Sequence, residues 1–130
     1  MASIFSKIVS GEIPAYIVAE SDDFLAFLDV NPVCYGHVLV IPKVETDYIF
    51  DLSDTDLAGL MTFAKIVAKR LKKVVDCKRI GISVVGLEVP HAHVHLMPIN
   101  NITDMDFGKP RLSLSKDEFK VLAEKIINAI

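Results

Sequence analysis

A chain of 130 residues, of which 52% are apolar and 24% are charged, can bury the core of one domain. That mixture excludes a disordered chain, and a formal net charge of −3 gives no support for general nucleic-acid binding. Apolar runs are far shorter than the roughly 20 residues needed to cross a bilayer, and the two cysteines form no paired motif, so we expect a cytoplasmic protein without a membrane partner.

The first part of the chain predicts a short helix followed by three strands. Ser3 can cap the helix, and Gly11 ends it. Two strands are expected at residues 17–20 and 24–29, where apolar and β-branched residues lie between turn signals. Residues 37–41 (HVLVI) are typical of a central strand covered on both faces. The helix is expected to bury Ile4, Phe5, Ile8 and Val9.

The middle of the chain predicts one long helix and two more strands. Ser53 or Asp54 begins the helix, and its lysines fall on the opposite, solvated side. Residues 79–85 and 91–98 read as strands that pair across the segment 86–90. The apolar residues at helical spacing are Leu57, Leu60, Met61, Ala64, Ala68, Leu71 and Val75.

The last part of the chain predicts a C-terminal helix. Ser115-x-x-Glu118 is a capping box that opens it, while residues 99–114 carry no assignable element. The whole of residues 1–130 is therefore expected to form one α+β domain, an antiparallel sheet of about five strands packed by one long helix, with short N-terminal and C-terminal helices. The C-terminal helix should bury Phe119, Leu122, Ala123, Ile126 and Ile127.

Three of the four histidines stand at alternate positions in HAHVHLMP, residues 91–98. Strand pleating would place His91, His93 and His95 on one face, each pair roughly 6.5–7 Å apart. Three imidazoles in a row are an unusual packing solution, because each has two nitrogens that need partners. Two functional interpretations remain beside the structural one: a metal site, and covalent catalysis at phosphorus with a histidine nucleophile.

The metal interpretation lacks a ligand set at fixed spacing. A strand-borne His-x-His can place two imidazoles on one ion, but further ligands would have to come from Glu88, Glu45, Asp29 or His37, which are remote or unpatterned in the sequence. Catalysis at phosphorus needs no metal, because imidazolium and backbone N–H groups can neutralise the developing charge.

The pattern HAHVHLM resembles the signature of the histidine triad (HIT) family of nucleotide hydrolases and transferases. The likeness extends upstream through SIFSKIVSGEIPA, AFLDVNP and GHVLVIPK, so it covers residues 3–98 in the right order, and residues 99–130 form a C-terminal extension that matches only loosely. The resemblance implies the HIT-like fold and a homodimer with a purine-nucleotide site in each protomer. It implies no cofactor and no catalytic metal.

By position, the resemblance implies that His93 attacks the α-phosphorus and forms a nucleotidyl-histidine intermediate. His91 would orient that ring through its backbone carbonyl, and His95 would contact the phosphate. Asp29 would hold the ribose hydroxyls, a task that suits a carboxylate. The purine pocket would be lined by Phe5, Ile8, Phe27, Leu28 and Val30.

The chain departs from the family pattern at two places. Leu87 and Glu88 replace a side-chain amide and a phosphate-binding hydroxyl beside the nucleotide, and a carboxylate there would repel a phosphate. Some relatives hold a structural zinc with two cysteines and a histidine at the positions of Ser3, Ser6 and Glu45, so we predict no structural zinc. His37 is expected to be structural.

Three functions therefore remain open from the sequence. The first is a nucleotidyl hydrolase or transferase that is independent of metal. The second is a nucleotide-binding module that has little or no turnover because of Leu87 and Glu88. A metal-binding β protein is the third.

Overall fold

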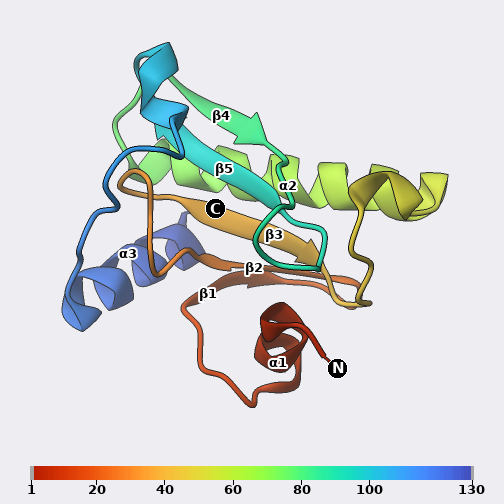
Figure 1. Ribbon diagram of the computed structural model, residues 1–130. Helices are drawn as coiled ribbons and strands as arrows, with labels where there is room; N and C mark the ends of the chain where they lie inside the picture. Colours follow the sequence, from red (N-terminus) through yellow and green to blue (C-terminus); the bar gives the residue numbers. More distant parts are fainter. Residues whose placement is uncertain (1, 130) are drawn as a thin grey trace.

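The computed structural model describes residues 2–129 and, over these residues, contains three α-helices, two 3-10 helices and five strands (Figure 1). The strands are β1 (Ile17–Glu20), β2 (Phe24–Leu28), β3 (Val38–Pro42), β4 (Arg79–Ser83) and β5 (Val94–Ile99), and the helices are α1 (Ile4–Ser10), α2 (Asp54–Val74), α3 (Lys116–Asn128), η1 (Ile49–Asp51) and η2 (Ile102–Met105). The strands form one antiparallel sheet in the order β1-β2-β3-β5-β4, which confirms the predicted fold class.

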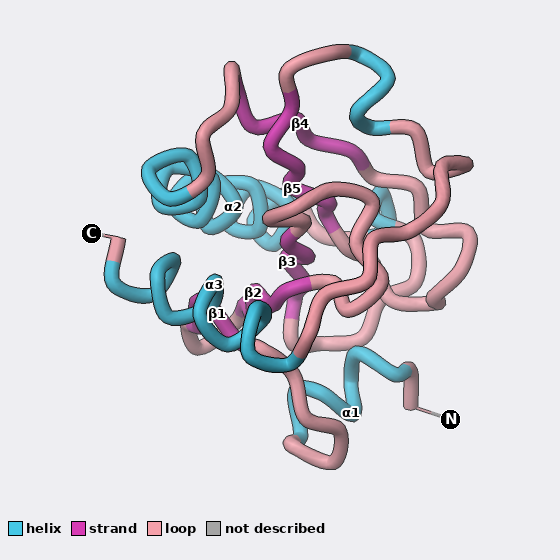
Figure 2. The backbone as a smooth tube through the Cα atoms, turned by 90° about the vertical axis from the view of Figure 1, so that its left-hand side faces the viewer, coloured by secondary structure: helices cyan, strands magenta, loops and turns pink. Residues whose placement is uncertain are grey.

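The sheet separates two layers. Helices α2 and α3 lie together on one side, and α1 and the long loops lie on the other (Figure 2). Strand β3 is central and buried along its whole length, as predicted. Its residues Val38 and Val40 belong to the larger core beneath α2 and α3, whereas Leu39 and Ile41 belong to a smaller core beneath α1. Side-chain alternation along a strand explains this division.

The predicted helix caps are confirmed. The Ser3 hydroxyl accepts a hydrogen bond from the Ser6 N–H, and α1 ends at Gly11, whose φ of 86° is a left-handed conformation that glycine adopts without strain. Ser53, and not Asp54, is the N-cap of α2. Ser115 and Glu118 form the expected capping box at α3.

The strand that carries the histidines is shorter than predicted. Strand β4 ends at Ser83, and β5 begins only at Val94, so the segment between them is a ten-residue loop that includes His91 and His93. The backbone explains the difference, because the Ala92 N–H donates to Thr46 O at 2.6 Å instead of to a neighbouring strand. Residues Ala92, Val94 and Leu96 nevertheless lie in the larger core, which places the intervening histidines on the α1 side.

Three apolar side chains that were expected to be buried are exposed. Ile4, Met61 and Ile127 have exposed fractions of 49%, 40% and 46%. Each immediately precedes or follows a buried residue on its helix, and a rotation of about 100° per residue turns it away from the sheet. Predicted core positions such as Leu60, Leu71 and Ile126 are fully buried.

The residues between β5 and α3, which the sequence left unassigned, contain η2 and an extended segment, residues 106–115. Figure 1 shows this segment running from η2, at the end of β5, down to α3. It is tied to the loop after β2 because the Leu112 N–H donates to Pro32 O at 2.9 Å. Both cysteines are free thiols. Within residues 2–129, no helix combines the length and the apolar character that a membrane crossing requires.

Candidate active site

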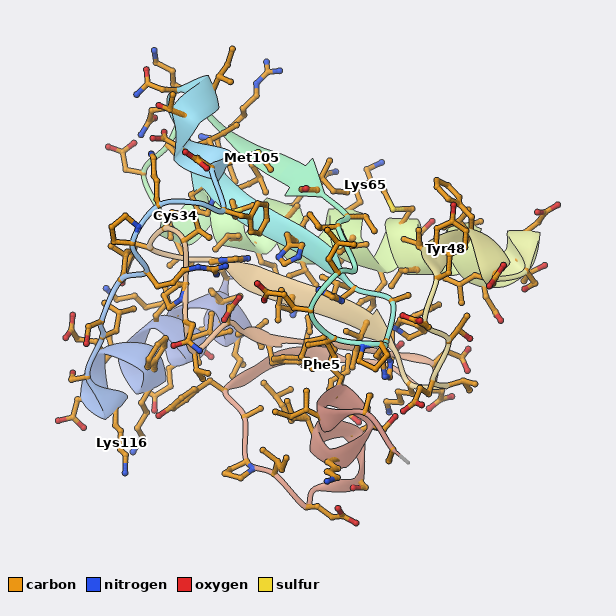
Figure 3. The ribbon with its side chains drawn as sticks, in the orientation of Figure 1. Phe5, Cys34, Tyr48, Lys65, Met105 and Lys116 are labelled. Atoms are coloured by element: carbon orange, nitrogen blue, oxygen red, sulfur yellow. The ribbon has the colours of Figure 1, made fainter. Side chains whose placement is uncertain are left out.

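A cleft with a volume of about 580 Å³ opens on the α1 side of the sheet. Its walls are α1, the end of β2, the loop before β5 and the extended segment 106–115. In Figure 3, Phe5 lies between α1 and the sheet, at the base of this region. Of the residues predicted for the site, seven line the cleft: Phe5, Asp29, Val30, Leu87, Glu88, His93 and His95.

Four predicted residues do not line the cleft. Phe27 is buried in the smaller core, where its ring meets Phe5 edge-on, and Ile8 packs against the same core. Leu28 points into the larger core on the opposite face, because it alternates with Phe27 and Asp29 along the chain. His91 is fully buried and does not reach the cleft.

His91 is held from both sides of its ring. Its Nε2 lies 2.8 Å from Pro42 O, and because a carbonyl only accepts, this nitrogen carries the proton. The Nδ1 atom therefore accepts the Ser3 hydroxyl, at 2.8 Å. Burial lowers the pKa of His91, which keeps the ring neutral. Both nitrogens of this buried ring therefore have hydrogen-bond partners. This is the structural role that the sequence disfavoured for the three triad histidines taken together.

His93 presents the opposite nitrogen. Its Nδ1 lies 2.7 Å from the His91 carbonyl oxygen and must donate to it, so a neutral His93 ring has an unprotonated Nε2. The ring packs edge-on against Phe5 and His95, with centroid distances of 5.1 and 4.8 Å. It also lines the cleft. A neutral imidazole with a fixed ring and a free Nε2 lone pair can act as a nucleophile.

His95 is positioned by His37. The Val33 N–H donates to His37 Nδ1 at 3.0 Å, so the His37 proton lies on Nε2, which donates to His95 Nδ1 at 2.9 Å. The His95 proton is thereby left on Nε2. Burial lowers the pKa of His37 to about 3 and that of His95 to about 4, so both rings are neutral near pH 7. His95 can thus donate a hydrogen bond into the cleft that it lines.

Asp29 stands at the end of β2 with one carboxylate oxygen engaged. The Asn31 N–H donates to Oδ1 at 2.8 Å. Oδ2 lies 3.7 Å from His37 Nδ1, but that nitrogen carries no proton and the ring is neutral, so the contact is not an ion pair. Burial raises the pKa of the Asp29 carboxyl. Oδ2 remains available to accept a hydrogen bond from a ligand.

Asp29, His37 and His95 are also a group that could offer three metal ligands, with ligand atoms within 4.8 Å of one another. The sequence named four possible further metal ligands, and two of them, Asp29 and His37, do lie close to a triad histidine, His95. The donor set does not fit an ion well, because His37 and His95 already bond to each other and His37 Nδ1 accepts from Val33. An ion would have to replace these hydrogen bonds.

Ser3, Ser6 and Glu45 converge on His91. Glu45 Oε1 accepts the Ser3 N–H at 2.6 Å and the Ser6 hydroxyl at 2.7 Å, and these bonds lower the pKa of Glu45 to about 2. We call these four residues the Ser3–Glu45–His91 network. Hydroxyls and one carboxylate do not make the nitrogen and sulfur set that tetrahedral zinc prefers, so the network does not fit a structural zinc site.

Among the cleft residues that the sequence did not predict for the site, two come from the C-terminal part of the chain. Phe107 and Arg111 come from the segment that carried no periodicity, and both line the cleft. The Phe107 ring lies edge-on to His95, with 4.8 Å between ring centroids. In the sequence, Phe107 is an isolated aromatic residue and Arg111 a lone arginine in a polar segment, and neither pattern predicts a contact with the histidines.

A second cavity of about 370 Å³ is also lined by His93. Apolar residues of the loop before α2, of α2 and of the segment after β4 line it, among them Tyr48 (labelled in Figure 3), Phe50, Met61, Val84 and Val85. These side chains are exposed, and Phe50 has an exposed fraction of 72%. An apolar surface therefore adjoins the candidate active site.

Comparison with protein families identifies residues 10–102 as a HIT domain. Among curated proteins, an uncharacterized HIT-like protein of Borreliella burgdorferi is 35% identical over 133 aligned positions, which cover 95% of this chain and 94% of that protein. The adenosine 5′-monophosphoramidase of Schizosaccharomyces pombe is 35% identical, with 100% of this chain and 99% of the relative covered.

Solved structures show the same architecture. A HIT-like protein from Bartonella henselae, described as involved in cell-cycle regulation, superposes with a TM-score of 0.85 at 28% identity, over 98% of this chain and 96% of that one. A zinc-bound histidine triad family protein from Mycobacterium smegmatis superposes with a TM-score of 0.81 at 27% identity, over 97% and 94%.

Proposed function

Because the chain belongs to the histidine triad (HIT) domain family, we propose that it is a nucleotidyl hydrolase or transferase. Its substrates would be phosphoramidates, dinucleoside polyphosphates or related esters of a purine nucleoside monophosphate. The observation that carries the proposal is the hydrogen bond of His93 Nδ1 to the His91 carbonyl, which leaves the Nε2 of a neutral ring free in a cleft shared with Asp29 and His95. The name of the Schizosaccharomyces pombe relative supports the phosphoramidate class.

In the proposed reaction, His93 Nε2 attacks the α-phosphorus. A nitrogen–phosphorus bond forms, the bond from phosphorus to the leaving group breaks, and the leaving group takes up a proton from solvent. Water then attacks the same phosphorus and the nitrogen–phosphorus bond breaks, which releases the nucleoside monophosphate, returns the proton of the water to solvent and restores the neutral ring. His95 Nε2–H would donate to a phosphate oxygen, and Asp29 Oδ2 would accept a ribose hydroxyl. No step requires a metal.

A second candidate, a nucleotide-binding module with little or no turnover, is favoured by one feature of the cleft. Leu87 and Glu88 line it, and Leu87 is 88% exposed, so this wall offers a carboxylate and an apolar side chain in place of polar donors. We also propose that the protein is a cytoplasmic homodimer, since free thiols fit a reducing compartment and an apolar surface adjoins the cleft.

The test is release of AMP from adenosine 5′-phosphoramidate by the parent protein and by two variants. His93→Ala should abolish release while the variant still binds AMP. Asp29→Ala should weaken AMP binding by ~1–3 kcal/mol, the scale of a hydrogen bond to a charged group. Tight AMP binding by a parent that releases no AMP would favour the binding module. AMP affinity that is equal in Asp29→Ala and the parent would remove Asp29 from the site.

A further inference from the structure

We propose that Arg111 binds the phosphate group of the nucleotide in the cleft. The inference rests on the proposed function and adds a residue to it. Arg111 lies in the segment 106–115, beyond residue 102, where the match to the HIT domain ends. The contribution would therefore come from the C-terminal part of this chain and not from the histidine signature.

The charge balance of the cleft requires a cation. Two acidic residues, Asp29 and Glu88, line it, and His95 is neutral near pH 7 because it is buried. A nucleoside monophosphate would bring further negative charge into the cleft, and this costs free energy unless a positive group is close. Among the described residues that line the cleft, Arg111 alone carries a permanent positive charge.

The geometry holds the guanidinium in place beside the site. Arg111 Nη1 donates to Asn31 O at 2.8 Å, two residues beyond Asp29. Its Cζ atom lies 5.8 Å from the centroid of the Phe107 ring, which is itself packed edge-on against His95. Arg111 is thus anchored next to the residues proposed for the ribose and for the phosphate.

The remaining donors of Arg111 are not used by a carboxylate. Within residues 2–129, no Asp or Glu oxygen lies within 4.0 Å of its guanidinium nitrogens, whereas Lys109 of the same segment pairs with Asp104 at 3.9 Å. A guanidinium has five N–H donors in a planar fork, and the Asn31 carbonyl accepts from one nitrogen. The free edge suits the two oxygens of a phosphate group.

The experiment compares AMP with adenosine, which lacks the phosphate, by titration calorimetry. Arg111→Gln should weaken AMP binding by about 10- to 100-fold, the range expected for a charged hydrogen-bond partner, and should leave adenosine binding nearly unchanged. Arg111→Lys should be intermediate, because it keeps the charge and loses the fork. Lys109→Gln is the matched control from the same segment and should bind both ligands as the parent does.

Two results would overturn the inference while the proposed function stands. One is unchanged AMP affinity in Arg111→Gln. The other is an equal loss for AMP and adenosine, which would mean that Arg111 only anchors the segment to Asn31. A parent that binds neither ligand would instead refute the proposed function, and this inference with it. A salt titration provides a second readout, since AMP affinity should depend on ionic strength more strongly in the parent than in Arg111→Gln.

Discussion

The three triad residues have the same side chain, but their partners give them different tautomers. His91 and His95 carry the proton on Nε2, whereas His93 carries it on Nδ1. A carbonyl oxygen decides the tautomer of His91 and of His93, and His37 decides it for His95. The pattern leaves the Nε2 lone pair of His93 and the Nε2–H of His95 free on two residues that line the same cleft, as the proposed transfer at phosphorus requires.

His37 is therefore expected to act through His95. His37→Leu removes the donor to His95 Nδ1, so His95 loses its fixed tautomer, and AMP release should fall by on the order of 10-fold or more. His37→Gln offers an amide N–H and an oxygen in similar places and should restore most of the rate. The measurement is the release rate together with nitrogen-15 NMR of labelled imidazoles, which reports where the His95 proton lies.

A purely structural role would give a different result for His37. Both variants would then lose stability, and the His95 tautomer and the rate of AMP release per folded molecule would stay as in the parent. That outcome would contradict the positioning role.

At the scale of elements, α1 is joined to the site by a network of hydrogen bonds. Ser3 both caps the helix and donates to His91, and Glu45 binds the Ser3 N–H and the Ser6 hydroxyl. Phe5 packs edge-on against His91 and His93 from the same helix. A helix of seven residues is too short to be stable alone, so these contacts hold it against the sheet.

Ser3→Ala should destabilise the fold more than an ordinary cap deletion. It removes the cap, worth about 1 kcal/mol, and also leaves the buried His91 Nδ1 without its donor, which costs about 1–3 kcal/mol more. Ser53→Ala, at the cap of α2, is the matched control and should cost about 1 kcal/mol with no effect on AMP release. Urea unfolding measures both, and equal losses in the two variants would argue against the network.

At the scale of the whole molecule, the buried histidines should make stability depend on pH. The native pKa values of His37 and His95, about 3 and about 4, lie below the ordinary value of 6.5. Below pH 6.5 the unfolded chain therefore binds protons that the native state does not, which favours unfolding. The stability that the buried, neutral histidines contribute is fully present above pH 6.5, and it is lost as the pH falls toward their native pKa values.

The free energy of unfolding should accordingly decrease between pH 6.5 and pH 4. Each unit by which a pKa is depressed corresponds to about 1.4 kcal/mol. Urea denaturation at a series of pH values measures the slope, and His37→Gln should reduce it by removing one of the buried histidines with a lowered pKa. A stability that stays constant over this interval would contradict the lowered pKa values, because it would show that the native and unfolded chains bind protons equally.

The proposed homodimer is also a property of the whole molecule, and exposed apolar residues near one edge of the sheet offer a surface for it. Strand β4 is an edge of the sheet, and Ile82 on it and Val84 and Val85 just beyond it are exposed, as are Met61 and Ile66 on α2. Val84→Lys should convert the dimer to a monomer in light scattering, because it buries a charge in an apolar contact. Ile127→Lys, at an exposed apolar position on α3, is the control. A monomeric parent would contradict the proposal.

The sequence by itself determined the features that depend on neighbours along the chain. Helix caps at Ser3 and Ser115, a cap at Ser53 or Asp54, the apolar run of β3 and the triad pattern are all written in short stretches, because hydrogen bonds and side-chain direction repeat over a few residues. The family resemblance added the roles expected of Asp29 and His93. Strand ends were less accurate, since a loop contact at Ala92 competes with the ladder.

Only the tertiary structure decided which distant side chains share the site. His37 and His95 are 58 positions apart, and Ser3 and His91 are 88 apart, yet each pair is joined by a hydrogen bond. The return of Phe107 and Arg111 to the cleft likewise follows from packing. Contacts of this range depend on how whole elements fit together, and no local period in the chain encodes them.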